Sequence, residues 1–163
     1  MMNALKTAAA LVALSVTPSL AQDIVLTISG AVDTPDSGTD WTFNMDSLQS
    51  MTTTTFETTT IWTEGVQTFQ GVSLKVLLDR VGAQGDTLRA VALNDYAVTI
   101  PKSDAVIDGP IVAYMRNGAD MSVRDKGPLW IVYPYDANET YKSEEYYSRS
   151  IWQLAKLEVV AAQ

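Results

Sequence analysis

The chain of 163 residues carries 11 basic and 19 acidic side chains, a net charge of −8, and neither histidine nor cysteine. Without these two residue types it cannot form disulfides, thiolate or imidazole zinc sites, His- or Cys-ligated haem, thiolate-bound Fe–S clusters, or Ser-His-Asp and Cys-His catalytic sites. Its acidity argues against nucleic acid and anionic lipid as partners. Catalysis would have to use carboxylates, Lys, Tyr or a bound cofactor.

The first residues have the pattern of a secretory signal peptide. Lys6 gives a short basic start, residues 7–16 are apolar but too few to span a bilayer, and Ser19-Leu20-Ala21 is a small-x-small cleavage site. We expect residues 1–21 to be a signal peptide cleaved after Ala21, which would make the protein periplasmic or secreted. Residues 22–163 are long enough for one domain. No later segment is long and apolar enough for an anchor, so we expect no membrane insertion of the mature chain.

The next residues predict two short strands joined by a loop. Residues 24–30 alternate, contain β-branched side chains and end in glycine, which is typical of a strand. Residues 33–40 are rich in Asp, Pro and Gly and indicate a turn-rich loop, after which 41–45 predict a second strand. Asp46 is expected to cap a single helical turn that runs through Leu48.

A run of threonines follows, with seven threonines among residues 52–60. Threonine is β-branched and favours extended, pleated backbone, so the run predicts a strand. Alternation along that strand would place two sets of side chains on opposite faces. One face would carry Thr53, Thr55, Glu57 and Thr59, and the other Thr54, Phe56, Thr58 and Thr60.

One clear helix is predicted after the threonine run. Ser73 is a suitable N-cap and Gly82 a suitable end for this helix. Apolar residues recur between them at helical spacing, at Leu74, Leu77, Leu78 and Val81. Hairpins are then expected over 88–101, turning near Asn94-Asp95, and over 110–121, turning at Asn117-Gly118.

The last third of the chain predicts strands on either side of a loop. Residues 129–134 indicate a buried strand, and 150–160 one or two closing strands. Residues 135–147 are polar and aromatic with little apolar periodicity, so we expect a long loop there. The whole pattern predicts a β-rich α+β domain with one good helix.

Several motifs occur in an order that resembles a known family. They are a threonine-rich strand before Trp62, F-x-G-V-x-L-x-x-L-L at 69–78, N-D-Y at 94–96, A-Y-x-x-N-G at 113–118, and D-K-G-P-L at 125–129 before V-Y-P. Together, over 23–160, they resemble the molybdopterin-binding domain of the sulfite oxidase family of oxidoreductases. Within that family the chain looks most similar to small exported stand-alone versions of the domain.

The resemblance implies a sulfite oxidase-type fold and a molybdenum cofactor, and two departures from the family bear on that cofactor. Family members bond the metal through a cysteine on the strand before the tryptophan, and the matching position here is Thr58 or Thr59. A threonine hydroxyl stays protonated and is a poor substitute for a soft thiolate. The family also carries an Arg near the cofactor where Gly127-Pro128-Leu129 leads here to Trp130, which cannot carry positive charge.

Seven residues are candidates for a ligand or cofactor pocket, each with a structural alternative. They are Thr58, Thr59, Trp62, Asn94, Lys126, Trp130 and Arg149. The threonines could instead simply favour a strand, the tryptophans could pack in the core, Asn94 could serve the hairpin turn, and the two cations could be solvated surface charges. No catalytic residue and no metal ligand are assigned.

Residues 135–147 raise two further hypotheses. The carboxylates of Asp136, Glu139, Glu144 and Glu145 lack the spacing of a calcium loop, which favours a solvated acidic loop. The tyrosines around them could form a recognition surface or hold the loop down.

The sequence favours a non-catalytic module that binds an unknown small ligand or a partner protein at the old cofactor site. No cofactor is expected, and molybdopterin is the one that the resemblance implies. One alternative is a molybdenum-cofactor-dependent oxidoreductase of the sulfite or sulfoxide class. The other is a structural partner of a membrane-bound sensor or another periplasmic protein.

Overall fold

The computed structural model describes residues 23–36 and 38–161, and the predicted signal peptide lies outside them. Within this part of the chain the strands are β1 (Ile24–Gly30), β2 (Trp41–Asn44), β3 (Thr53–Thr58), β4 (Gln67–Ser73), β5 (Thr87–Ala92), β6 (Ala97–Pro101), β7 (Ile111–Arg116), β8 (Ala119–Asp120), β9 (Trp130–Val132) and β10 (Leu154–Val160). The helices are α1 (Met45–Gln49), α2 (Leu74–Arg80), α3 (Glu144–Arg149) and the 3-10 turns η1 (Lys102–Asp104), η2 (Val123–Asp125) and η3 (Glu139–Tyr141). The fold is therefore α+β and rich in strands, as the sequence predicts.

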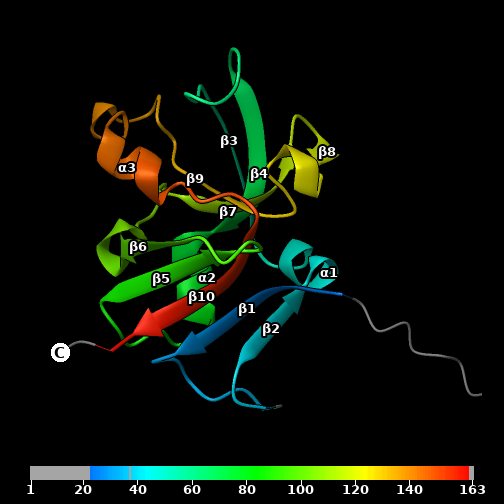
Figure 1. Ribbon diagram of the computed structural model, residues 1–163, viewed down its shortest axis with the longest axis vertical. Coiled ribbons are helices and arrows are strands. Elements are labelled where there is room, and N and C mark those ends of the chain that lie inside the picture. The colour runs from blue at the N-terminus through cyan, green and yellow to red at the C-terminus, as the bar shows by residue number, and fades with distance from the viewer. Residues whose placement is uncertain (1–22, 37, 162–163) are drawn as a thin grey trace, which may run out of the picture.

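The strands form two sheets (Figure 1). The first has the order β2-β1-β10-β5-β6, with β1 and β10 parallel and the other neighbours antiparallel. The second has the order β3-β4-β7-β8, and β9 also pairs with β7. Figure 1 shows the β3–β4 hairpin rising away from the first sheet, with α3 to its left and β8 to its right in this view. Between β9 of the second sheet and β10 of the first, the chain therefore crosses from one sheet to the other.

One continuous apolar core joins the two sheets and α2. Leu74, Leu77 and Leu78 of α2 are buried, which confirms the helix that their spacing predicts. Gly71 allows β4 to approach β7 closely, since a Cβ there would lie 2.1 Å from the carbonyl oxygen of Val112. A side chain at this position would therefore force the strands of the second sheet apart.

Most local predictions are confirmed. The hairpin turn at Asn117-Gly118 has φ values of 54° and 77°, the left-handed geometry that an Asn-Gly hairpin turn requires. In β3, Thr54, Phe56 and Thr58 lie on the more buried face, in agreement with the predicted alternation. The strand ends at Thr58, however, so the alternation does not extend to Thr59 and Thr60.

Two local predictions are wrong. The N-cap of α1 is Asn44 and not Asp46, because the Asn44 Oδ1 accepts the Ser47 N–H at 2.8 Å while Asp46 lies in the first helical turn. The predicted loop 135–147 instead contains η3 and most of α3. Alpha-helix α3 has no fully buried residue, so its sequence carries no strong apolar periodicity, and its position depends on tertiary contacts. The domain consequently has three short α-helices in its described part where one good helix was expected.

Among the residues that the structure describes, none of the helices combines the length and the hydropathy needed to cross a bilayer.

Candidate functional site

The threonine run delivers two hydroxyl groups to the end of β3, and Asp136 binds both residues. Thr58 is fully buried, and its Oγ1 accepts the backbone N–H of Asp136 at 3.1 Å. Thr59 donates its backbone N–H and its hydroxyl to the two carboxylate oxygens of Asp136, at 2.5 and 2.9 Å. The two bonds from Thr59, with its N–H as the largest cause, and the Lys142 ammonium 3.3 Å away hold the pKa of Asp136 below its usual value. The polar groups at the end of β3 are thus occupied by the chain itself.

Replacing Asp136 with Ala is expected to lower the free energy of unfolding by about 1 kcal/mol at pH 7, because two hydrogen bonds to a partly exposed carboxylate are lost. The folded pKa of Asp136 is depressed, so the carboxylate stabilises the protein at pH values above its unfolded pKa, near 4. That contribution should fade as the pH falls through the lower folded pKa. Urea unfolding of both proteins between pH 7 and pH 2 measures this difference. A difference that is the same at all pH values would contradict the assignment.

Trp62, in the loop after β3, is the centre of an aromatic cluster. Its ring packs edge-to-face against four others, with centroid distances of 5.7–6.4 Å. Those rings belong to Trp130, Tyr135, Tyr147 and Trp152. Edge-to-face pairs of this kind add stabilisation beyond the area that they bury. The loop is therefore held at its root by Asp136 and at Trp62 by the cluster.

Trp130 lies at the bottom of the cluster and is completely buried. It packs perpendicular to Phe69 at 5.3 Å, and its indole N–H donates to the carbonyl oxygen of Ser150 at 3.1 Å. The ammonium of Lys126 lies 5.7 Å from the centroid of Trp130 and 5.4 Å from that of Trp152. The Trp130 indole thus fills the space between Phe69 and Trp62 and packs against both rings.

Arg149, at the end of α3, belongs to a buried polar network. Its guanidinium pairs with the carboxylate of Asp104 at 2.9 Å, contacts Glu145, and stacks on the ring of Tyr146. Burial opposes the charge of Arg149, but the two carboxylates outweigh it and raise its pKa. Burial, and then the hydrogen bond to Asp104, raises the pKa of Tyr133, so this phenol stays protonated and donates to Asp104 at 2.7 Å. The network attaches α3 to η1.

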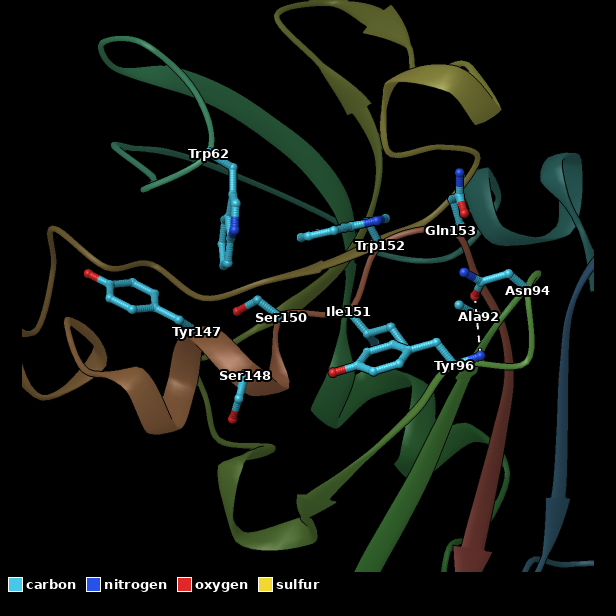
Figure 2. A pocket seen from close by; sticks show the side chains of 10 residues that line it. All are labelled: Trp62, Ala92, Asn94, Tyr96, Tyr147, Ser148, Ser150, Ile151, Trp152 and Gln153. Atoms are coloured by element: carbon cyan, nitrogen blue, oxygen red, sulfur yellow. Dashed lines mark hydrogen bonds between the residues drawn. The ribbon is translucent and has the colours of Figure 1, made fainter.

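A cavity of about 310 Å³ opens beside the aromatic cluster (Figure 2). Its walls come from the loop after β3, the β5–β6 turn, α3 and the segment before β10. The lining residues are Trp62, Ala92, Asn94, Tyr96, Tyr147, Ser148, Ser150, Ile151, Trp152 and Gln153. An aromatic pocket with a few polar groups on its wall is typical of small-molecule sites.

Two of the seven candidate residues, Trp62 and Asn94, line this cavity. Thr58 and Trp130 are buried, and Thr59 and Arg149 are paired with carboxylates outside the cavity. Lys126 does not line the cavity, but its ammonium lies over Trp152, which does. Trp152 and Gln153 also line the cavity, and no motif in the sequence pointed to them. A break in the pattern of the closing strand could have pointed to them. Strand alternation places buried residues two positions apart, but the buried residues Ile151 and Leu154 are three positions apart.

The residues present do not fit a molybdenum cofactor that the protein holds through a thiolate. The sequence has no cysteine, and Thr58, one of the two matching positions, is fully buried with its hydroxyl hydrogen-bonded within the chain. The other matching residue, Thr59, is bound at both its N–H and its hydroxyl. In the described residues, no three carboxylate side chains come together as a metal site, and the calcium alternative has no geometric support.

Comparison with known proteins agrees with the fold. No family model matches this chain, and a search of curated proteins finds no match. Among solved structures, the sulfane dehydrogenase SoxCD from Paracoccus pantotrophus is similar, with a TM-score of 0.63 and 20% sequence identity. The match covers 86% of this chain and 39% of that chain, so the present chain spans well under half of its length. The likeness supports a sulfite-oxidase-like fold.

Proposed function

We propose that this chain is a non-catalytic binding module built on a sulfite-oxidase-like domain, and that it binds a small ligand in the aromatic cavity. The observation that carries the proposal is the contrast between two adjacent places. At the end of β3, Thr58 and Thr59 are bound to Asp136 and present no metal donor. Beside them, the aromatic cavity offers open apolar surface with polar groups at its edge.

The structural neighbour is described as a dehydrogenase, which is an oxidoreductase. This chain lacks the residue types that we expect such chemistry to need at the cofactor. The two positions that match the family's metal-ligating cysteine are threonines, and Trp130 replaces the family's arginine as a buried core residue. A neutral hydroxyl and an indole provide neither a soft ligand nor a positive charge for an oxyanion. These substitutions favour recognition over redox turnover on the same scaffold.

The setting of the binding module is part of the proposal. The basic and apolar start of the sequence and its Ser19-Leu20-Ala21 site support export to the periplasm or outside the cell. The tyrosines near α3 pack on one another, with centroid distances of 5.0–5.4 Å among Tyr133, Tyr141 and Tyr146. This packing supports a role in holding the segment down, and it gives less support to a tyrosine surface for a membrane-bound sensor.

Metal analysis tests the non-catalytic proposal directly. The full chain, expressed in a host that makes molybdenum cofactor and purified without chelators, is expected to contain no stoichiometric molybdenum, because it has no thiolate to hold the metal. A cysteine-bearing domain of the sulfite oxidase family from the same host serves as the control for cofactor supply. One molybdenum atom per chain, together with sulfite or sulfoxide turnover, would overturn the proposal in favour of the oxidoreductase.

A further inference from the structure

Two amide side chains on the wall of the cavity are held in defined orientations. Asn94 Oδ1 accepts the backbone N–H of Tyr96 at 3.2 Å, which leaves its Nδ2 group as a donor. Gln153 Nε2 donates to the carbonyl oxygen of Val123 at 2.7 Å, which leaves its Oε1 atom as an acceptor. No hydrogen bond joins either remaining atom to another described residue. Figure 2 shows the Asn94 nitrogen and the Gln153 oxygen facing the same gap. One edge of the cavity therefore presents a donor beside an acceptor.

The two serine hydroxyl groups on the other side of the cavity are already hydrogen-bonded within the chain. Ser148 donates to the carbonyl oxygen of Glu145 at 2.7 Å, and Ser150 donates to that of Tyr146 at 2.8 Å. Ser150 Oγ also bonds to the hydroxyl of Tyr135. The serine protons are thus committed within the chain, whereas the amide edge offers a ligand one donor and one acceptor.

The charge around the cavity favours a neutral ligand. No Asp, Glu, Lys or Arg is among the lining residues, so an ion that entered would lose water without meeting a charged side chain on the cavity wall. Aromatic walls can attract a quaternary ammonium group, but here the ammonium of Lys126 already lies 5.4 Å from the centroid of Trp152. A cationic ligand would have to share that ring with a like charge.

The open aromatic surfaces favour a flat ligand. Trp152 is 39% exposed and Tyr96 is 59% exposed, although both are large apolar side chains. Figure 2 shows their rings above and below the opening, with Trp62 and Tyr147 on the side away from the amides. A planar ring placed between Trp152 and Tyr96 would cover both and bring its edge to the amide pair.

We propose that the cavity binds a neutral, planar heterocycle that carries a lactam edge, an N–H next to a C=O. The ring stacks between Trp152 and Tyr96, the ligand N–H donates to Gln153 Oε1, and the ligand carbonyl accepts from Asn94 Nδ2. Adjacent donor and acceptor groups read the complementary edge of a heterocycle in the way that Asn and Gln read base edges in nucleic acids. This inference rests on the proposed function, because it specifies the ligand class of the same cavity.

Three probes, used in calorimetric titrations of the full chain at pH 7, distinguish hydrogen bonding to the lactam edge from stacking on the aromatic rings. Hypoxanthine has a planar ring and a lactam edge, 1-methylhypoxanthine lacks the lactam N–H, and quinoline is planar without a lactam. Hypoxanthine is expected to bind at least tenfold more tightly than 1-methylhypoxanthine, because methylation removes a hydrogen bond and leaves Gln153 Oε1 unpaired. The indole N–H resonances of Trp62 and Trp152 in NMR spectra should shift on binding, while that of Trp41 stays in place.

Asn94→Asp is the matched variant for the edge. It keeps the oxygen that accepts the Tyr96 N–H and replaces the free donor with an acceptor. We expect it to weaken hypoxanthine binding at least tenfold and to change quinoline binding less than twofold. Asn117→Asp, the same substitution in the β7–β8 turn outside the cavity wall, should leave both affinities unchanged.

Each outcome of these titrations decides a specific point. Equal affinity for hypoxanthine and 1-methylhypoxanthine, or no effect of Asn94→Asp, would overturn the lactam inference. Quinoline binding that Trp152→Ala abolishes would in that case still support the binding module. If none of the probes binds and the protein carries one molybdenum atom per chain, both the inference and the proposed function are wrong. If none binds and the protein carries no molybdenum, the lactam inference alone is overturned.

Discussion

Replacing Trp130 with Ala is expected to lower the free energy of unfolding by about 3–5 kcal/mol, the range for removing a large aromatic side chain from a packed core. The indole is completely buried, packs against Phe69 and Trp62, and donates to the carbonyl oxygen of Ser150. Its removal would leave a cavity and an unpaired carbonyl group together. Urea unfolding followed by far-UV circular dichroism measures the change without depending on tryptophan fluorescence.

Two other tryptophan variants give this prediction its controls. Trp130→Phe keeps an aromatic ring but loses the indole N–H, so it should cost less than Trp130→Ala. Trp152→Ala removes a side chain that is 39% exposed and should cost less than either, although it removes a wall of the cavity. A loss below about 1 kcal/mol for Trp130→Ala would mean that Trp130 is not the support of the cluster.

Replacing Asp104 with Ala is expected to cost about 3 kcal/mol, because it leaves the mostly buried Arg149 without its main partner. The side chains of Asp104 and Arg149 are only 7% and 13% exposed, so water cannot fully replace the lost carboxylate. The hydroxyl of Tyr133 would lose its acceptor as well. Since α3 carries Tyr147 and Ser148 of the cavity wall, we expect the affinity of any cavity ligand to fall with stability.

A double-mutant cycle measures the coupling energy between Asp104 and Arg149 separately from their contacts with other residues. Arg149→Met keeps the length of the side chain and removes the charge, and the Asp104→Ala, Arg149→Met double variant leaves neither charge unpaired. We expect the double variant to be more stable than the sum of the two single losses implies, with a positive coupling. Strictly additive losses would show that Asp104 and Arg149 act independently and that the ion pair does not hold α3. The Asp104→Asn variant, which keeps an acceptor for Tyr133, should fall between wild type and Asp104→Ala.

The sequence predicts the fold well where local pattern determines structure. The leucine spacing of α2, the Asn117-Gly118 turn and the alternation in β3 all appear as expected. It fails at α3, which has no fully buried residue and is held through Asp104 and the aromatic rings. Periodicity reports burial on one face of an element, and a helix that is only partly covered leaves little periodicity to read.

The same limit applies to the candidate site. The order of motifs that resembles the family pointed to Trp62 and Asn94 as candidates, but it did not point to Trp152 or Gln153. Asp136 was considered only as part of an acidic loop, yet it binds Thr59, 77 positions away. Such a pair leaves no trace in either local segment, because a carboxylate in a polar loop looks the same whether or not it has a partner.

Composition alone limits the chemistry that the side chains of this protein can supply. A chain without cysteine or histidine cannot supply a thiolate or an imidazole, whatever its fold. What takes their place depends on tertiary contacts: the threonines bind Asp136, Trp130 fills the core, and three separate segments line an aromatic cavity. Composition sets which groups exist, while the contacts of side chains far apart in sequence depend on how the two sheets bring their segments together.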